Sequence, residues 1–250
     1  MKIAAIADIH TRVNSFDQID ALFDGIDERA DALILAGDLT DSGLPAEMEV
    51  LLSRLRLMKI PIVAVLGNHD HESDVAEKLS NMLISAGVHV LDGTAVEFDG
   101  VGFVGTKGFA GGFGKCLVQP FGERALKTFI QSSIDEAIRL ENALTKLDCP
   151  YKVAVLHYSP ITETLIGEPE ELYPFLGSSR LMNALDRHGV EVIFHGHAHH
   201  GSPEGSTQDG TPVYNVSRFV RTTHDLSPYC MFEVGETVKV SGNYSNAIIE

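Results

Sequence analysis

Strand-length runs of apolar residues recur through the first part of the chain. They cover residues 3–7, 32–36, 62–66 and 88–91, and almost no polar side chain interrupts them. Such runs are typical of parallel sheets, because helices cover both faces of those sheets. The segments between the runs carry apolar residues at helical spacing, as in Ile19, Leu22, Phe23 and Ile26. The alternation predicts βαβ units with right-handed crossovers.

The pattern changes in the second half of the chain. Residues 94–98 and 101–105 flank an Asp99-Gly100 turn, which indicates a hairpin and an antiparallel part of the sheet. A long helix is predicted over residues 123–147, with Leu126, Ile130, Ile134, Ile138 and Leu144 on or near one face. Further strands are predicted at 151–156 and 191–194, a helix at 179–188, and short antiparallel strands at 212–216, 229–234 and 237–240.

The order of these elements predicts the fold class. The chain shows no linker and no internal repeat, so we expect a single domain over residues 1–250. Its class is α/β, with two mixed sheets packed together and flanked by helices. Two stretches match no regular element: the glycine-rich residues 105–114 and the proline-containing residues 159–178. The first is either a loop over the active site, with Phe109 and Phe113 touching substrate, or a surface loop that these rings anchor to the core.

Composition narrows the classes of function. The 250 residues carry a formal net charge of −16, which argues against nucleic-acid partners, because binding to a phosphate backbone needs clustered Lys and Arg. A phosphate substrate is compatible with that charge, because metal ions can reverse the sign of the local field. No run is long enough to span a membrane, and the first strand follows Met1-Lys2 directly, which leaves no room for a signal peptide. We therefore expect a cytoplasmic protein.

Five polar clusters close the apolar runs. They read Asp8-Ile-His10, Gly37-Asp38-Leu-Thr-Asp41, Gly67-Asn68-His69-Asp70, His157, and His195-Gly-His197-Ala-His199. Strand ends are where an open α/β sheet presents functional side chains, so these groups are expected to converge. Their mixture of carboxylate, amide and imidazole ligands suits Mn, Fe, Zn, Ni or Co ions. Two such ions side by side are a recurring device for cleaving phosphate esters.

Each cluster alone has an ordinary explanation. A carboxylate near a histidine is common on surfaces, and Asn68-His69-Asp70 alone is compatible with an Asx turn. A lone His157 is more often a buried, hydrogen-bonded histidine, and dense histidines such as those at 195–200 can bind metal adventitiously. The decisive observation is that all five clusters occur in order, each at the end of an apolar run.

Together the clusters resemble the signature of the calcineurin-like metallophosphoesterase superfamily, which reads DxH, GDxxD, GNH(D/E), a lone His and GHxH. The resemblance runs from Asp8 to His199 and every element is intact. It implies a four-layer sandwich with a dimetal site at the strand ends. One departure is Thr11, which stands where many members carry glycine and leaves the shape of that loop open.

The resemblance also implies the role of each residue. The implied ligands of the first metal are Asp8, His10 and His199, those of the second are Asn68, His157 and His197, and Asp38 bridges the two ions. A hydroxide held by both ions would attack phosphorus. His69 is the implied general acid for the leaving group, and the Asp41 carboxylate is the implied partner that orients it.

We therefore predict a dinuclear, metal-dependent hydrolase of a small phosphoester. The resemblance to small members of the superfamily slightly favours a diesterase over a phosphomonoesterase. A non-catalytic, metal-binding interaction scaffold with the same fold is the alternative from a different class. The residues that bind substrate and the oligomeric state are not predicted from the sequence.

Overall fold

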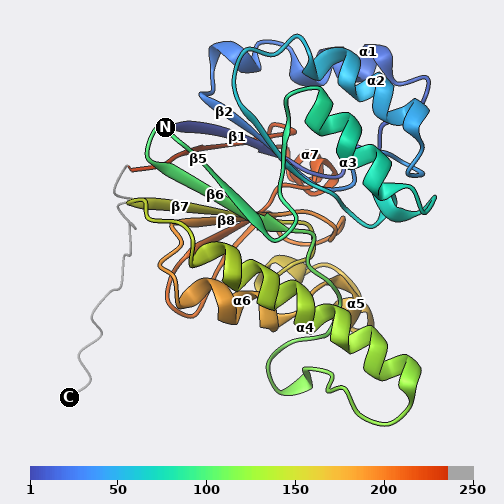
Figure 1. Cartoon of the computed structure of the whole chain (residues 1–250), viewed down its shortest axis with the longest axis vertical. Coiled ribbons are helices and arrows are strands. Elements are labelled where there is room, and N and C mark those ends of the chain that lie inside the picture. Colours follow the sequence, from blue (N-terminus) through green and yellow to red (C-terminus); the bar gives the residue numbers. More distant parts are fainter. Residues whose placement is uncertain (236–250) are drawn as a thin grey trace.

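The computed structural model describes residues 1–235, which form two mixed sheets packed face to face with helices on both outer sides (Figure 1). Among these residues, one sheet has five strands in the order β11-β1-β2-β3-β4, and the other has six in the order β5-β6-β7-β8-β10-β9. This arrangement confirms the predicted α/β class with two sheets flanked by helices. No helix in this part of the chain is both long and apolar enough to cross a bilayer.

The first sheet and its helices come mainly from the N-terminal part of the chain. Its strands are β1 (Lys2–Ile6), β2 (Ala32–Ala36), β3 (Ile62–Val65) and β4 (His89–Val90), all mutually parallel, with β11 (Cys230–Glu233) antiparallel beside β1. Its helices are α1 (Phe16–Phe23), α2 (Pro45–Leu55) and α3 (Ala76–Ser85), with a 3₁₀ turn at Ile26–Glu28. The predicted βαβ alternation is therefore present.

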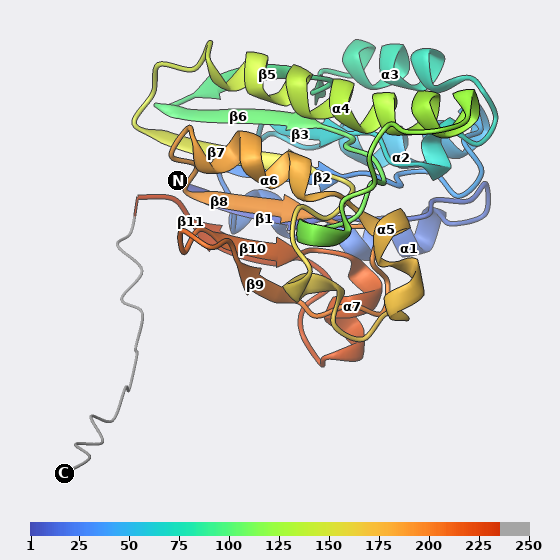
Figure 2. The same ribbon diagram turned by 90° about the horizontal axis from the view of Figure 1, so that it is seen from below.

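The second sheet begins with the predicted hairpin. β5 (Thr94–Phe98) and β6 (Val101–Thr106) are antiparallel, and β6 continues in parallel with β7 (Tyr151–Leu156), β8 (Val192–His195) and β10 (Pro212–Asn215). β9 (Glu204–Ser206) closes the edge antiparallel to β10. The helices α4 (Arg124–Leu144), α5 (Tyr173–Leu176) and α6 (Ser179–Asp186) cover the outer face. Figure 2 shows β8 and β10 running side by side, with α7 (Arg218–Thr223) beyond their ends.

Three apolar cores separate the four layers. Alternate residues of β1 face opposite ways, so Ala4 and Ile6 pack under the first helices, whereas Ile3 and Ala5 pack between the sheets. The third core lies between the second sheet and helices α4 and α6. Both faces of the central strands are therefore buried, which explains their almost uninterrupted apolar sequence.

Several predictions about elements need correction. Helix α4 buries Ile130 and Leu140 but exposes Leu126 and Ile138, so the predicted apolar face was placed too far around the helix. The strand predicted at 212–216 is parallel to β8, although it is antiparallel to β9. Neither β9 nor α7 was predicted, because each is short and lacks a clear apolar period. The strand predicted at 237–240 lies outside the described residues.

The two stretches that matched no regular element are hydrogen-bonded to each other. Gly111 N–H donates to Pro174 O at 2.7 Å and Gly112 N–H donates to Gly177 O at 3.0 Å. Phe109 packs between Phe129 and Tyr158, with ring centroids 4.9 and 5.8 Å away. For Phe109, the loop over residues 105–114 therefore matches the alternative in which an aromatic side chain anchors it to the core.

Candidate metal centre

The polar clusters converge because most of the strands that carry them are parallel within their sheets. β1, β2, β3, β7 and β8 all present their carboxyl ends at the same edge of the sandwich. Four of the clustered residues leave their strands in the left-handed region, with φ of 56° at Asp8, 47° at His10, 51° at Asp38 and 71° at His197. Non-glycine residues rarely adopt this conformation, and it gathers at functional sites. The backbone thus turns sharply just after the strands, at the residues that carry the clustered side chains.

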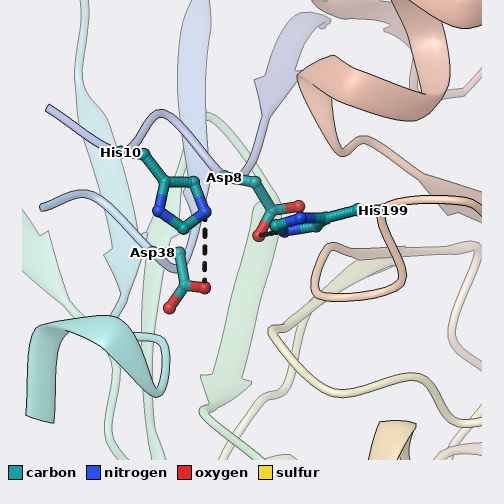
Figure 3. A group of neighbouring side chains, drawn as sticks. All are labelled: Asp8, His10, Asp38 and His199. Carbon is teal, nitrogen blue, oxygen red and sulfur yellow. Dashed lines mark ion pairs between the residues drawn. The ribbon is translucent and has the colours of Figure 1, made fainter. Parts of the chain in front are cut away.

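The first group of candidate ligands contains Asp8, His10, Asp38 and His199 (Figure 3). One ligand atom from each lies within 4.8 Å of the others. His10 Nε2 is 3.7 Å from Asp38 Oδ2, and His199 Nε2 is 3.4 Å from Asp8 Oδ1. A single cation can therefore contact all four side chains.

The second group shares Asp38 with the first. Asp38, His157 and His197 again offer ligand atoms within 4.8 Å of one another. His157 Nε2 lies 3.3 Å from Asp38 Oδ1 and 2.9 Å from the amide oxygen of Asn68. The structure thus brings together all seven predicted ligands. The two oxygens of Asp38 face different groups, as the implied bridging role requires.

The residues present suit metal ions. His10 Nε2 is buried and has no hydrogen-bond partner among the described residues, which is a costly state for an imidazole nitrogen unless it binds a cation. The carboxylates of Asp8 and Asp38 are 0% and 1% exposed, and their ion-pair partners in the described chain are histidines. Two buried carboxylates together need positive charge, and divalent ions bound by carboxylate and imidazole supply it.

The electrostatics of the histidines reflect this demand for positive charge. Burial opposes protonation of His157, but the adjacent Asp38 and Asp8 carboxylates outweigh it and raise the pKa of His157 to about 9. Burial, followed by the charge of His157, lowers the pKa of His197 to about 3. The two carboxylates therefore favour a positive charge on His157, beside the place where a metal would sit.

Backbone carbonyls fix two of the imidazole ligands. His157 Nδ1 lies 3.0 Å from Ala36 O, and His197 Nε2 lies 3.3 Å from Phe175 O. A carbonyl can only accept, so each of these nitrogens carries the proton and leaves the other nitrogen to bind metal. Phe175 belongs to the 159–178 stretch, which thus has a role in orienting a ligand of the second group.

The structure corrects the expected contact between the Asp41 carboxylate and His69. His69 Nδ1 donates to the backbone carbonyl of Asp41 at 2.7 Å. The Asp41 carboxylate instead lies 3.4 Å from His10 Nδ1 and accepts two hydrogen bonds from Arg12, at 2.9 and 3.3 Å. The reason is local: Thr11 is fully buried and pairs with Thr40, which places Arg12 and Asp41 side by side.

His69 lies directly beside the first group of candidate ligands. Its backbone N–H donates to Asp38 Oδ1 at 2.8 Å, and its ring meets that of His10 edge-on, with centroids 4.5 Å apart. The proton on Nδ1 is committed to the Asp41 carbonyl, so Nε2 is the nitrogen available to a substrate. His69 is thus next to the candidate ligands but belongs to neither ligand group.

Three neighbouring polar residues have structural partners instead. Asp70 is fully buried and accepts hydrogen bonds from Gly67, Leu39 and Thr40, which ties the second and third clusters together. Both ring nitrogens of His195 are occupied, by Gly196 O and the Thr164 hydroxyl, each at 2.8 Å. His200 donates its backbone N–H to Glu168 Oε1 at 2.7 Å.

Close packing requires the glycines of two signature elements. A Cβ added at Gly67 would lie 2.1 Å from Asp38 Oδ1, a distance that no side chain can occupy. At Gly37 the φ of +88° adds a conformational requirement, because L-residues rarely adopt it. These two glycines therefore let the clusters approach each other.

The site opens into a cleft of about 640 Å³. The cleft is lined by His10, Arg12, Asn14, Ser15, Gln18, Asp41, His69, His199, Arg218 and Phe219. Phe219 packs its ring 4.8 Å from that of His199 and 5.7 Å from that of His10. The sequence prediction missed Arg218 and Phe219, although the signal was there: both follow a predicted strand end, at residues 212–216.

Comparison with known proteins agrees with this geometry. The family model described as calcineurin-like phosphoesterase matches residues 1–201. A probable cyclic nucleotide phosphodiesterase from Synechococcus sp. is 31% identical over 87 residues, which make up 31% of this chain and 34% of that protein. The match therefore spans about a third of that relative's length.

Two solved structures share the fold. The crystal structure of phosphopantetheinyl hydrolase from Mycobacterium tuberculosis superposes with a TM-score of 0.71 at 17% identity, over 96% of this chain and 98% of that one. A putative 5′-nucleotidase from Staphylococcus aureus superposes with a TM-score of 0.52 at 16% identity, over 86% of this chain and 48% of that one. The structural likeness supports the fold, and the family match covers most of the sequence, so the chain belongs to the calcineurin-like phosphoesterase family.

Proposed function

We propose that this protein hydrolyses phosphoesters, with a preference for diesters, at a centre of two metal ions. The observation that carries the proposal is the sharing of Asp38 by two groups of candidate ligands beside a cleft that also holds His69. The partial match to a probable cyclic nucleotide phosphodiesterase supports the preference for diesters. The metals we propose are Mn, Fe, Zn, Ni or Co, because the ligands are oxygens and imidazole nitrogens without thiolate.

The first ion would be held by Asp8, His10 and His199, the second by Asn68, His157 and His197, and Asp38 would contact both. When bound, such ions neutralise phosphoryl charge and lower the pKa of water. The buried carboxylates hold them in place, and the carbonyls of Ala36 and Phe175 keep two ligand imidazoles in one orientation.

His69 would deliver the proton to the leaving oxygen from Nε2. Before the transfer the ring would carry a proton on each nitrogen. The Asp41 carbonyl holds the proton on Nδ1, so loss of the Nε2 proton to the leaving oxygen leaves the neutral Nδ1–H ring. This proton transfer contributes about 10²–10⁴ in rate where the leaving group is a poor one. Good leaving groups need the proton less.

A panel of phosphoesters tests the proposal. The metal-loaded protein is expected to hydrolyse chromogenic diesters faster than the matching monoesters, and the chelated protein to hydrolyse neither. His69→Ala should keep its metal and lose most rate with the poorest leaving groups. If His69→Ala loses the same factor in rate with all leaving groups, His69 is not the general acid. If the metal-loaded protein hydrolyses no phosphoester, the proposed function is wrong.

The substrate we propose is a small molecule in the cytoplasm. The net charge of −16 disfavours a nucleic-acid partner.

A further inference from the structure

Arg218 lies in the candidate active-site cleft and belongs to none of the signature clusters. It is the first residue of α7, which follows β10 at the edge of the sheet where the clusters gather. The chain leading to it joins the two sheets: Ala7 N–H donates to Val216 O at 2.9 Å, and Arg218 N–H donates to Ala7 O at 3.1 Å. Arg218 is therefore held beside Asp8 by the backbone on both sides.

One edge of the guanidinium is fixed. Arg218 Nε donates to the backbone carbonyl of Asp8 at 3.0 Å, and the guanidinium carbon lies 4.7 Å from the centroid of the Phe219 ring. The same ring packs against His10 and His199. Ring and carbonyl together set the plane of the guanidinium, so little side-chain entropy is lost when it binds a further partner.

The other edge of the guanidinium faces the cleft. Within residues 1–235, Nη1 and Nη2 of Arg218 have no hydrogen-bond acceptor and no carboxylate within ion-pair distance. The cleft's other arginine differs, because Arg12 is already paired with Asp41 through two hydrogen bonds. Arg218 is thus the cleft arginine whose Nη donors pair with no side chain among residues 1–235.

We propose that Arg218 is a substrate-binding residue whose free guanidinium edge receives an anionic oxygen of the phosphoester. The planar fork of donors matches the spacing of phosphate or carboxylate oxygens. That oxygen belongs either to the phosphoryl group or to an acidic group on the leaving side, because His69 lines the same cleft. This inference rests on the proposed function for the identity of the ligand, but not for the binding itself.

Calorimetry on the metal-loaded protein tests the inference without requiring turnover. The probes are inorganic phosphate, phenylphosphonate and 4-carboxyphenylphosphonate, because the proposed reaction does not cleave a C–P bond. Arg218→Gln should weaken binding about 10- to 100-fold, as expected for a charged hydrogen-bonding group, and Arg218→Lys should recover part of the loss. The matched control is Arg56→Gln, which removes an exposed, ion-paired arginine outside the cleft and should bind all probes as the unmodified protein does.

The probes distinguish the two sources of the oxygen. A loss for all three ligands indicates that Arg218 binds the phosphoryl group, whereas a loss only for 4-carboxyphenylphosphonate indicates that it binds an acidic group on the leaving side. Elemental analysis should find the same metal content in every variant. Unchanged binding of all probes by Arg218→Gln would overturn the inference, and so would a loss of metal equal in Gln and Lys variants, which would mean that Arg218 only supports Asp8.

Failure of the inference is distinguishable from failure of the function. If the protein binds phosphate through Arg218 but hydrolyses no phosphoester, the inference about Arg218 holds and the proposed function is wrong. If the protein hydrolyses phosphoesters equally well with and without Arg218, the proposed function holds and the inference about Arg218 is wrong.

Discussion

Among single residues, Asp41 has the contacts that differ most from those expected from the sequence. The signature resemblance implied that its carboxylate orients His69, but the carboxylate faces His10 and Arg12 while the backbone carbonyl holds His69. A carboxylate behind a metal-bound imidazole fixes the ring and increases its basicity. In the proposed centre, the Asp41 carboxylate would therefore support His10, a ligand of the first metal.

Replacement of Asp41 tests this reassignment. Asp41→Ala keeps the backbone carbonyl that His69 needs but removes the partner of His10, so one of the two metal affinities should fall about 10- to 100-fold. Calorimetric titration with Mn²⁺ measures both affinities. If both stay unchanged and turnover falls mainly for poor leaving groups, the carboxylate acts on His69 after all.

The burial of His195 predicts that the stability of the protein depends on pH. It is fully buried, and burial lowers its pKa to about 4, although the Gly196 carbonyl partly opposes the shift. In the unfolded chain its pKa is near 6.5, so between pH 6.5 and 4 the unfolded state binds a proton that the folded state does not. The free energy of unfolding should therefore fall as pH decreases through this window, by on the order of 3 kcal/mol.

His195→Gln isolates that contribution, because glutamine does not titrate there and can still donate and accept. Denaturant unfolding of both proteins in chelator, at several pH values, gives the two slopes. The variant should lose part of the acid sensitivity, and parallel slopes would show that His195 titrates normally in the fold.

At the scale of elements, the turns after the strands decide the geometry of the site. Gly67 closes β3 and leaves room for the Asp38 carboxylate, because a Cβ there would meet Asp38 Oδ1 at 2.1 Å. Gly67→Ala should therefore displace Asp38 and reduce the metal content below two per chain.

A matched control is Gly87→Ala, where no atom lies within 4 Å of the added Cβ and only the φ of +88° opposes the side chain. It should cost about 1 kcal/mol in stability and keep its metals. Elemental analysis and thermal unfolding compare the two variants. Full metal content in Gly67→Ala would show that Asp38 tolerates displacement.

Elements with a clear hydrophobic pattern could be predicted from the sequence, and elements without one could not. β1, β2 and β3 are buried on both faces, so their composition alone identifies them. Helix α7 buries only Val220 and Arg221, which gives no readable period. The face of α4 was misplaced because Glu136 is buried there, hydrogen-bonded to Thr106 and Gly108, while Ile138 is exposed.

At the scale of the whole molecule, both sheets contribute to one site. Asp8, Asp38 and Asn68 follow strands of the first sheet, and His157 and His197 follow strands of the second. The sequence order of the clusters predicted their convergence, because parallel strands share an edge. It could not predict that residues 216–218 join the sheets at that edge, since these contacts depend on tertiary packing.

The proposed phosphoesterase centre consists of two ions bridged by Asp38. The most direct test titrates the metal-free protein with Mn²⁺ while following hydrolysis of bis(p-nitrophenyl) phosphate. We predict that activity rises to a plateau at two ions per chain, and that Asp38→Ala shows neither the stoichiometry nor the activity. Full activity at one ion per chain, or an Asp38→Ala variant that binds two ions and hydrolyses the diester, would contradict the account.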